Sequence, residues 1–176
     1  LELQKPVAEM AERSVKYNGL QDKISMVCGN LKDAPELFGK SSFQYITCNP
    51  PYKEAGGGLL TSTDITAIAR HEIMCSLEDV VRVSSILLEP QGKLCMIHRP
   101  ERLADIIYIM KKYRIEPKRM RFIHSYTHKS PVMLLIEGAR YGNPKLFIDP
   151  PLYIYERTGV YSSEINKIYG RKDDNK

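Results

Sequence analysis

The sequence predicts an α/β fold, in which a largely parallel sheet carries helices on both faces and an antiparallel strand pair at its edge. Helical stretches alternate with short β-branched or apolar strands through residues 5–113, the pattern of α/β proteins. Two strand-like runs, 118–125 and 131–140, then follow each other with only a short connection, which indicates a hairpin. A length of 176 residues suits one domain with a full core.

The individual elements follow from apolar periodicity and from end signals. Apolar residues repeat on one face of the first helix, which Asn18-Gly19 ends, and Ser76 with Asp79 resembles the capping box of a later helix. The run FQYITC is too apolar for a solvated face, so we expect a central parallel strand. In chain order we expect a strand end at 1–4, helix 5–19, strand 24–28, a loop or short helix at 31–39, strand 43–48, helix 64–74, helix 76–92 ended by Pro90 and Gly92, strand 93–98, helix 101–113, strands 118–125 and 131–140, and then short extended pieces and turns.

Composition excludes several classes of protein. Hydrophobic residues make up 43% and charged residues 27%, as in globular domains, and no apolar run approaches the roughly 18 residues of a membrane span. The start LELQKPVAEM has no signal-peptide core. None of the four cysteines stands in a CxxC pair, so we expect free buried thiols, no metal and a cytoplasmic location. We expect a single domain at 1–170, a solvated tail at 171–176 and a monomer.

The motif Asn49-Pro50-Pro51-Tyr52 directly follows the strand 43–48 and precedes three glycines, Gly56 to Gly58. Ligands of open α/β sheets lie beyond the carboxyl ends of the strands. Two prolines stiffen the backbone and remove two N–H donors, so the Asn49 side-chain oxygen and the Pro50 carbonyl can accept both N–H bonds of one amino group. Tyr52 offers a ring for stacking, worth about 1–3 kcal/mol for a base.

This arrangement suits alkylation of a planar amine. Two acceptors on the amino group favour the positively charged transition state, and holding the nitrogen beside a methyl donor supplies the proximity that the reaction needs. No strong general base is required, because the amine becomes acidic once it is methylated. A tight turn after a strand is the structural alternative for the same four residues.

With this motif the chain resembles the class I S-adenosylmethionine-dependent methyltransferases of the (N/D)PP(Y/F) group. More narrowly, it is similar to the bacterial enzymes that N6-methylate an adenine beside the anticodon of a valine tRNA (position 37 type). The resemblance implies a Rossmann-like seven-stranded methyltransferase sheet with an antiparallel last strand, S-adenosyl-L-methionine as cofactor and tRNA as partner. The segments that carry it are LELQKPVAEMAERSV, NPPY, ARHE at 69–72, IHRPERL at 97–103, KRMRFIHSY and DPPLYIY.

The resemblance also implies the cofactor contacts. Glu2 would accept hydrogen bonds from the ribose hydroxyls, and Leu3 would pack on the adenine ring. Asn30-Leu31 stands where the family usually has an acidic residue against the adenine amino group, so we expect a weaker contact there. Asn49 would lie against both cofactor and substrate. The glycine-rich loop of the family would precede Glu2 and has no counterpart in this sequence, so we expect a chain without the N-terminal strand and helix of the fold, which alone binds the cofactor poorly.

For the substrate, the resemblance implies that Asn49 to Tyr52 hold the target adenine. Lys53, Arg70 on a helix near the active face, and Arg99 at the ligand edge of the sheet are further candidates for substrate binding; a structural role is the alternative for Arg70. His124 and His128 are predicted to be packing or surface residues. The net charge of +5 suits a polyanionic partner. A basic set with Tyr113 and Tyr126 nearby is either an RNA-facing patch or an ordinary solvated face; its members are Lys111, Lys112, Arg114, Lys118, Arg119 and Arg121.

Three other functions remain open at this point. A glutamine N5-methyltransferase of a peptide-chain release factor uses the same four residues on a carboxamide, although the ARHE and DPPLYIY segments argue against it. A DNA adenine-N6 methyltransferase is the second alternative, but no target-recognition insertion is evident. The third is a binding module that has kept the fold without the reaction.

Overall fold

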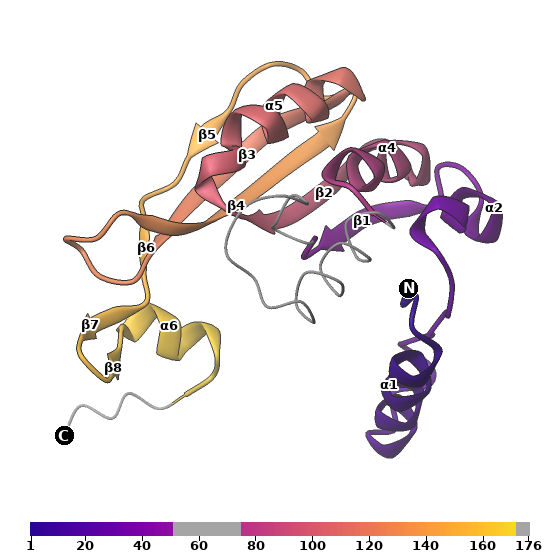
Figure 1. Ribbon diagram of the computed structural model, residues 1–176, viewed down its shortest axis with the longest axis horizontal. Coiled ribbons are helices and arrows are strands. Elements are labelled where there is room, and N and C mark those ends of the chain that lie inside the picture. Colours follow the sequence, from indigo (N-terminus) through magenta and orange to yellow (C-terminus); the bar gives the residue numbers. More distant parts are fainter. Residues whose placement is uncertain (51–74, 172–176) are drawn as a thin grey trace, which may run out of the picture.

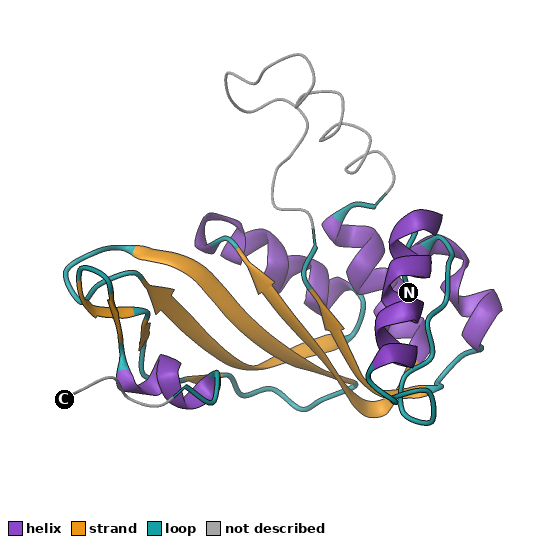
Figure 2. Ribbon diagram, turned by 90° about the horizontal axis from the view of Figure 1, so that it is seen from below, coloured by secondary structure: helices purple, strands orange, loops and turns teal. Residues whose placement is uncertain are grey.

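The computed structural model describes residues 1–50 and 75–171. They form a twisted sheet with α4 and α5 side by side on one face, and a small unit of β7, β8 and α6 at the end opposite to α1 (Figures 1 and 2). In chain order the elements are α1 (Lys5–Tyr17), η1 (Leu31–Asp33), α2 (Ala34–Phe38), β1 (Phe43–Cys48), α4 (Leu77–Leu87), β2 (Leu88–His98), η2 (Pro100–Arg102), α5 (Leu103–Lys112), β3 (Ile115–His124), β4 (Pro131–Arg140), β5 (Phe147–Ile148), β6 (Leu152–Tyr153), β7 (Tyr155–Arg157), β8 (Val160–Tyr161) and α6 (Ser163–Ile168).

The main sheet has the order β1-β2-β4-β3-β5, and β6 also pairs with β3. β1 is parallel to β2, whereas β4 is antiparallel to both of its neighbours, β2 and β3. The predicted α/β class and the antiparallel strand are thereby confirmed. The described residues give six strands in this sheet, so the predicted count of seven is not confirmed. No described helix has the length and apolar character to cross a membrane.

β1 corrects the prediction of a central strand. It pairs with β2 on one side, with Ile46 opposite Leu94 and Cys48 opposite Met96, and among the described residues it is the edge of the sheet. None of its residues is fully buried, and Tyr45 is 65% exposed. An apolar run in the sequence does not specify that a strand has a hydrogen-bonded neighbour on each side.

The predicted strand at 24–28 is also reduced in the structure. Only a single parallel bridge forms there, between Glu2 and Cys28. It joins the first residues of the chain to the segment before η1, and it places Glu2 at a fixed point opposite the free edge of β1.

The boundary between α4 and β2 differs from the prediction. α4 begins at the predicted capping box of Ser76 and Asp79, but β2 starts directly after it and contains Pro90 and Gly92. The register with β1 shifts in this stretch, and Gln91 has φ of +67°. The two residues expected to end a helix therefore form an irregularity inside a strand, where a proline without an N–H is tolerated.

α6 was predicted only as part of a series of turns and is a helix in the structure. The Ser162 side chain caps it by accepting a hydrogen bond from the Ile165 N–H. The four short strands before it agree with the predicted extended pieces. A helix of six residues is too short for an apolar period to be visible in the sequence.

Three apolar clusters hold the described layers together. The largest one lies between α4, α5 and the sheet, and includes the fully buried Ile106, Met110 and Leu134. Packing there is tight at Gly138 of β4, where an added Cβ would overlap Met110 Cε and lie 2.8 Å from Ile115 Cγ2. Another cluster is formed by Ile123, Leu152 and Ile165, and fastens β6 and α6 to the end of β3.

Candidate active site

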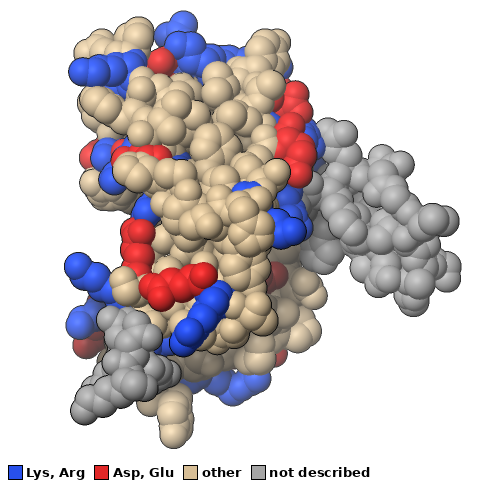
Figure 3. Space-filling view, turned by 90° about the vertical axis from the view of Figure 1, so that its left-hand side faces the viewer, with Lys and Arg blue, Asp and Glu red and all other residues tan. Residues whose placement is uncertain are grey.

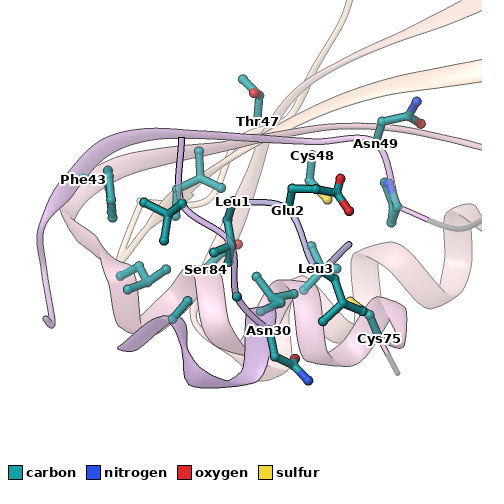
Figure 4. Close-up of a pocket in the computed structure, with 18 of the residues that line it drawn as sticks. Leu1, Glu2, Leu3, Asn30, Phe43, Thr47, Cys48, Asn49, Cys75 and Ser84 are labelled. Carbon is teal, nitrogen blue, oxygen red and sulfur yellow. The ribbon is translucent and has the colours of Figure 1, made fainter. Parts of the chain in front are cut away.

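A pocket of about 1350 Å³ lies between the free edge of β1, residues 1–4, the segment before α2, and α4 (Figure 4). The pocket brings together those residues predicted to bind cofactor or substrate that the structure describes. The predicted residues that line the pocket are Glu2, Leu3, Asn30, Leu31, Asn49, Pro50 and Arg99. The other predicted site residues, Pro51, Tyr52, Lys53 and Arg70, lie outside the described residues, as do the glycines after them.

Glu2 is held in place by its backbone. Its N–H donates to the Val27 carbonyl at 2.9 Å, and its carbonyl accepts from the Gly29 N–H at 2.9 Å. One carboxylate oxygen accepts from the Gln4 N–H at 2.8 Å. A carboxylate has about four acceptor positions, so the group can accept from a ligand as well. Figure 4 shows this carboxylate directed toward the side of the pocket where Cys48 and Asn49 lie.

Asn30 has a structural role that the sequence did not indicate. Its side-chain oxygen accepts from the Lys32 N–H at 2.9 Å and so caps η1. One lone pair of that oxygen remains for a ligand, which fits the weaker adenine contact expected from an Asn at this position. Leu31 packs against the cores under α4, and Leu3 is 37% exposed at the pocket, so each offers apolar surface to a flat ring.

The carboxyl end of β1 presents an amide above a buried proline. Asn49 is exposed and Pro50 is buried, so the side chain opens to the pocket while the backbone below it is anchored. Burial, with the neighbouring Cys75, raises the pKa of the Cys48 thiol to about 11. Because only the thiolate is nucleophilic, Cys48 is an inert part of the wall at neutral pH.

Arg99 follows the end of β2, the strand next to β1. Its guanidinium donates to the Val132 carbonyl at 3.2 Å, and its backbone N–H donates to Nδ1 of His98 at 2.8 Å. His98 is 1% exposed, and burial lowers its pKa, with Arg102 and Arg99 acting in the same direction. Arg99 is thus an exposed cation at the same edge of the sheet as Asn49.

Several polar residues of the pocket were not predicted from the sequence, among them Glu101 and Ser84. Glu101 lines it from η2 and Ser84 from α4. Glu101 could have been found from its place just beyond the strand 93–98, at the ligand edge. Ser84 is 2% exposed and interrupts the apolar face of α4, a weak signal because buried serines are common in helices.

The four cysteines are free, as predicted, but they are not fully buried: Cys28 is exposed and the other three are half-buried. Among residues 1–50 and 75–171 no group of three or more His, Cys, Asp or Glu side chains could hold a metal ion.

Most of the basic residues predicted as a candidate RNA-facing patch pair with acidic side chains of the same chain. Four of the six members of this set form ion pairs within the chain, which favours the ordinary solvated face over the RNA-facing patch. The pairs are Lys111–Glu116 at 2.7 Å, Lys112–Glu78 at 2.6 Å, Arg119–Asp149 at 2.5 Å and Arg121–Glu164 at 2.6 Å.

Comparison with known proteins gives relatives in sequence, although no protein-family model matches the chain. The tRNA1(Val) (adenine(37)-N6)-methyltransferase of Porphyromonas gingivalis is 30% identical over 169 residues, which cover 93% of this chain and 65% of that protein. The protein of the same name from Shewanella frigidimarina is 28% identical over 116 residues, covering 64% and 45%. The chain therefore spans less than two thirds of the length of these relatives.

Solved structures agree with the fold. A predicted O-methyltransferase from Agrobacterium tumefaciens matches with a TM-score of 0.75 and 18% identity, over 99% of this chain and 79% of that chain. A geranyl diphosphate methyltransferase in complex with S-adenosylmethionine matches with a TM-score of 0.54 and 14% identity, over 79% and 66%. These likenesses confirm the predicted methyltransferase fold.

Proposed function

The chain is a homologue of the tRNA1(Val) (adenine(37)-N6)-methyltransferases, and on that basis we propose that the protein transfers a methyl group from S-adenosyl-L-methionine to N6 of an adenine in the anticodon loop of a tRNA. The observation that carries the proposal is the pocket. It brings Glu2, Asn30, Asn49 and Arg99 to one place from segments that are far apart in the sequence.

Glu2, Leu3 and Asn30 suit the adenosine half of the cofactor. The Glu2 carboxylate can accept hydrogen bonds from two ribose hydroxyls, and its fixed backbone means that little freedom is lost on binding. Leu3 and Leu31 offer apolar surface on which the adenine ring can pack, and the remaining lone pair of Asn30 can accept from the adenine amino group. The bound cofactor supplies an electrophilic methyl group.

Asn49 and Pro50 suit the target amino group. The side-chain oxygen of Asn49 and the carbonyl of Pro50 accept its two N–H bonds, which turns the nitrogen lone pair away from both acceptors and toward the methyl group. The same acceptors stabilise the positive charge that develops on nitrogen as the new N–C bond forms. The proton leaves to water afterwards, because the methylated amine is acidic.

Arg99 suits a phosphate of the RNA backbone. Its guanidinium lies at the ligand edge, is exposed, and donates to the Val132 carbonyl at 3.2 Å. A planar guanidinium can donate two parallel hydrogen bonds to a phosphate. Arg99 would thereby orient the strand that carries the target adenine.

The test is a methyl-transfer assay on the full-length protein with radiolabelled S-adenosylmethionine. Bulk tRNA, a peptide-chain release factor and duplex DNA are offered in parallel, and Asn49→Ala is compared with Gln21→Ala, which removes an exposed amide outside the pocket. We expect label in tRNA with the wild type and with Gln21→Ala, and none with Asn49→Ala. Label in the release factor or the DNA alone would contradict the proposed substrate.

A further inference from the structure

Stacked side chains form a continuous series at the β7, β8 and α6 end of the molecule. They come from three separate segments: the turn after β3, the β7–β8 hairpin and the residues around the end of α6. We name this series the aromatic ladder. Its members are, in order, His128, Tyr126, Tyr155, Tyr161, Arg171 and Tyr169. The centroids of successive rings from His128 to Tyr161 are 5.7, 5.4 and 5.1 Å apart. The Cζ atom of Arg171 lies 4.8 Å from the ring centroid of Tyr161 and 5.2 Å from that of Tyr169.

The planes in the ladder are close to parallel. The interplanar angle is 21° between Tyr126 and His128, 30° between Tyr126 and Tyr155, and 23° between Tyr155 and Tyr161. Rings buried for packing alone commonly meet edge to face as well as stacked. A nucleobase can stack on the end of such a column, because its own ring is planar.

The ladder does not form the apolar core of this unit. That core is the cluster of Ile123, Leu152 and Ile165, with Ile97, Met133 and Ile154 against it. The ends of the ladder are open to solvent instead. Tyr169 is 67% exposed and Tyr161 39%, and His128 is exposed at the opposite end.

Positive charge surrounds the ladder. Lys129, Arg157, Lys167 and Arg171 belong to the same three segments, and in the part of the chain that the structure describes none of them forms an ion pair. Glu164, an acid of α6, is already bound by Arg121 through both carboxylate oxygens, at 2.6 and 2.8 Å. The end-on view in Figure 3 shows a broad area without charged side chains, with both basic and acidic side chains at its margins.

The ladder follows the carboxyl end of β3, and Asn49 of the pocket follows the carboxyl end of β1. β6 is parallel to the end of β3, and the Tyr155 N–H donates to the Ser125 carbonyl at 3.0 Å. Because β4 is antiparallel to both β2 and β3, the strands β1, β2 and β3 all run in one direction. The register aligns Cys48, through Met96 and Ile136, with Met120, so β3 runs four residues farther than β1. With three strand steps of about 4.8 Å and four residues of about 3.3 Å, the carboxyl ends of β1 and β3 are about 20 Å apart.

We propose that the aromatic ladder binds the single-stranded loop of the RNA substrate, with bases stacked on its exposed ends and phosphates paired with the surrounding cations. Single-stranded RNA is recognised through unstacked bases that lie on aromatic rings or on the guanidinium of Arg. The separation from Asn49 is the reach of a few nucleotides, so one loop contacts both places. The identity of the RNA rests on the proposed function; the stacking surface rests on the ladder itself.

The test measures RNA affinity and methyl transfer separately with the full-length protein. The probe for affinity is a fluorescent anticodon stem–loop RNA, and the variants are Tyr169→Ala, His128→Ala and Arg171→Lys. The last keeps the charge but removes the planar group. Tyr17→Ala, which removes a 92% exposed ring on α1, is the matched control.

We expect each ladder variant to raise the Kd for the stem–loop by at least about fivefold, the equivalent of one stacked base, and Tyr17→Ala to leave it unchanged. The KM for tRNA should rise with it, while kcat at saturating tRNA stays at the wild-type value. Because these side chains are exposed, the melting temperature should not move.

Wild-type affinity in all three ladder variants overturns the inference, and so does a loss confined to binding of a protein such as the release factor. Unchanged ladder variants in a protein that methylates tRNA would remove only this inference. Ladder-dependent RNA binding without methyl transfer would support the ladder and remove only the proposed reaction.

Discussion

The pocket beside β1 and the aromatic ladder beyond the end of β3 belong to one sheet but are built from different kinds of contact. In the pocket, hydrogen bonds from the backbone fix the polar side chains: Gln4 donates to Glu2, and Lys32 donates to Asn30. In the ladder, planar groups stack on one another, and the cations around them form no ion pair with the described residues. The difference matches two tasks, because a reaction requires atoms at fixed positions whereas affinity for a flexible strand requires surface and charge.

The comparison predicts that variants in the two places affect different kinetic constants. Asn49→Ala should give the largest effect, a fall in kcat of about 10²–10³-fold, by analogy with the loss of one transition-state hydrogen-bonding group. The Kd for the stem–loop RNA should change little, because stacking and phosphate contacts remain. Single-turnover methylation beside RNA binding measures both. A fall in RNA affinity as large as the fall in kcat would contradict the assignment of catalysis to the pocket and of RNA binding to the ladder.

Glu2→Gln should weaken binding of the cofactor by about 10- to 150-fold, the range for a hydrogen bond to a charged group. RNA affinity should again be unchanged. Calorimetric titration with S-adenosylmethionine measures the effect, and Glu9→Gln, an exposed acid on α1 outside the pocket, is the control. Equal affinities in the two variants would remove Glu2 from the cofactor site.

Gly138→Ala tests the strand that joins the two regions, since β4 lies between β2 and β3. The added methyl would overlap Met110 and lie 3.0 Å from the Glu116 carbonyl oxygen, so the free energy of unfolding should fall by about 1–3 kcal/mol. Chemical denaturation measures the loss. In the double variant with Met110→Ala the two losses should not add, because the overlap at Met110 is gone. Strict additivity would contradict this account of the packing.

His98 should give the smallest effect, a dependence of stability on pH. Its imidazole is buried at the end of β2, and its pKa in the folded protein lies below the ordinary value. As pH falls below about 6.5, the unfolded chain takes up a proton before the folded one, so stability decreases until the folded pKa is passed. The denaturation midpoint, measured from about pH 8 to about pH 5 on either side of the ordinary histidine pKa of about 6.5, should fall in the wild type. It should fall less in His98→Gln, which has no imidazole to protonate.

The sequence was sufficient where local chemistry determines the structure. The capping box of Ser76 and Asp79 correctly placed the start of α4, and Asn18-Gly19 correctly ended α1, with Gly19 at φ of +64°. The alternation of elements gave the class of fold. It did not give the position of β1 in the sheet or the start of β2 at Leu88, because both depend on pairing between distant segments.

The two functional regions differed in the same way. A continuous motif and a resemblance to known enzymes indicated the pocket, and the described residues at those positions do line it. The ladder has no such motif. Its members at 126, 155, 161 and 169 share no period, and only the pairing of β6 with β3 brings them together. Three-dimensional proximity without sequence proximity is the information that the chain alone did not reveal.

The attachment of the β7–β8–α6 unit has a consequence for how such proteins can diversify. The unit is attached to the carboxyl end of β3 by three features: the pairing of β6 with β3, the apolar cluster around Ile165 and the Arg121–Glu164 ion pair. No residue of the unit lines the pocket. Mutation, shortening or replacement of this appendage can therefore alter which nucleic acid is captured while the reacting groups keep their places, so selection can act on recognition and on chemistry one at a time.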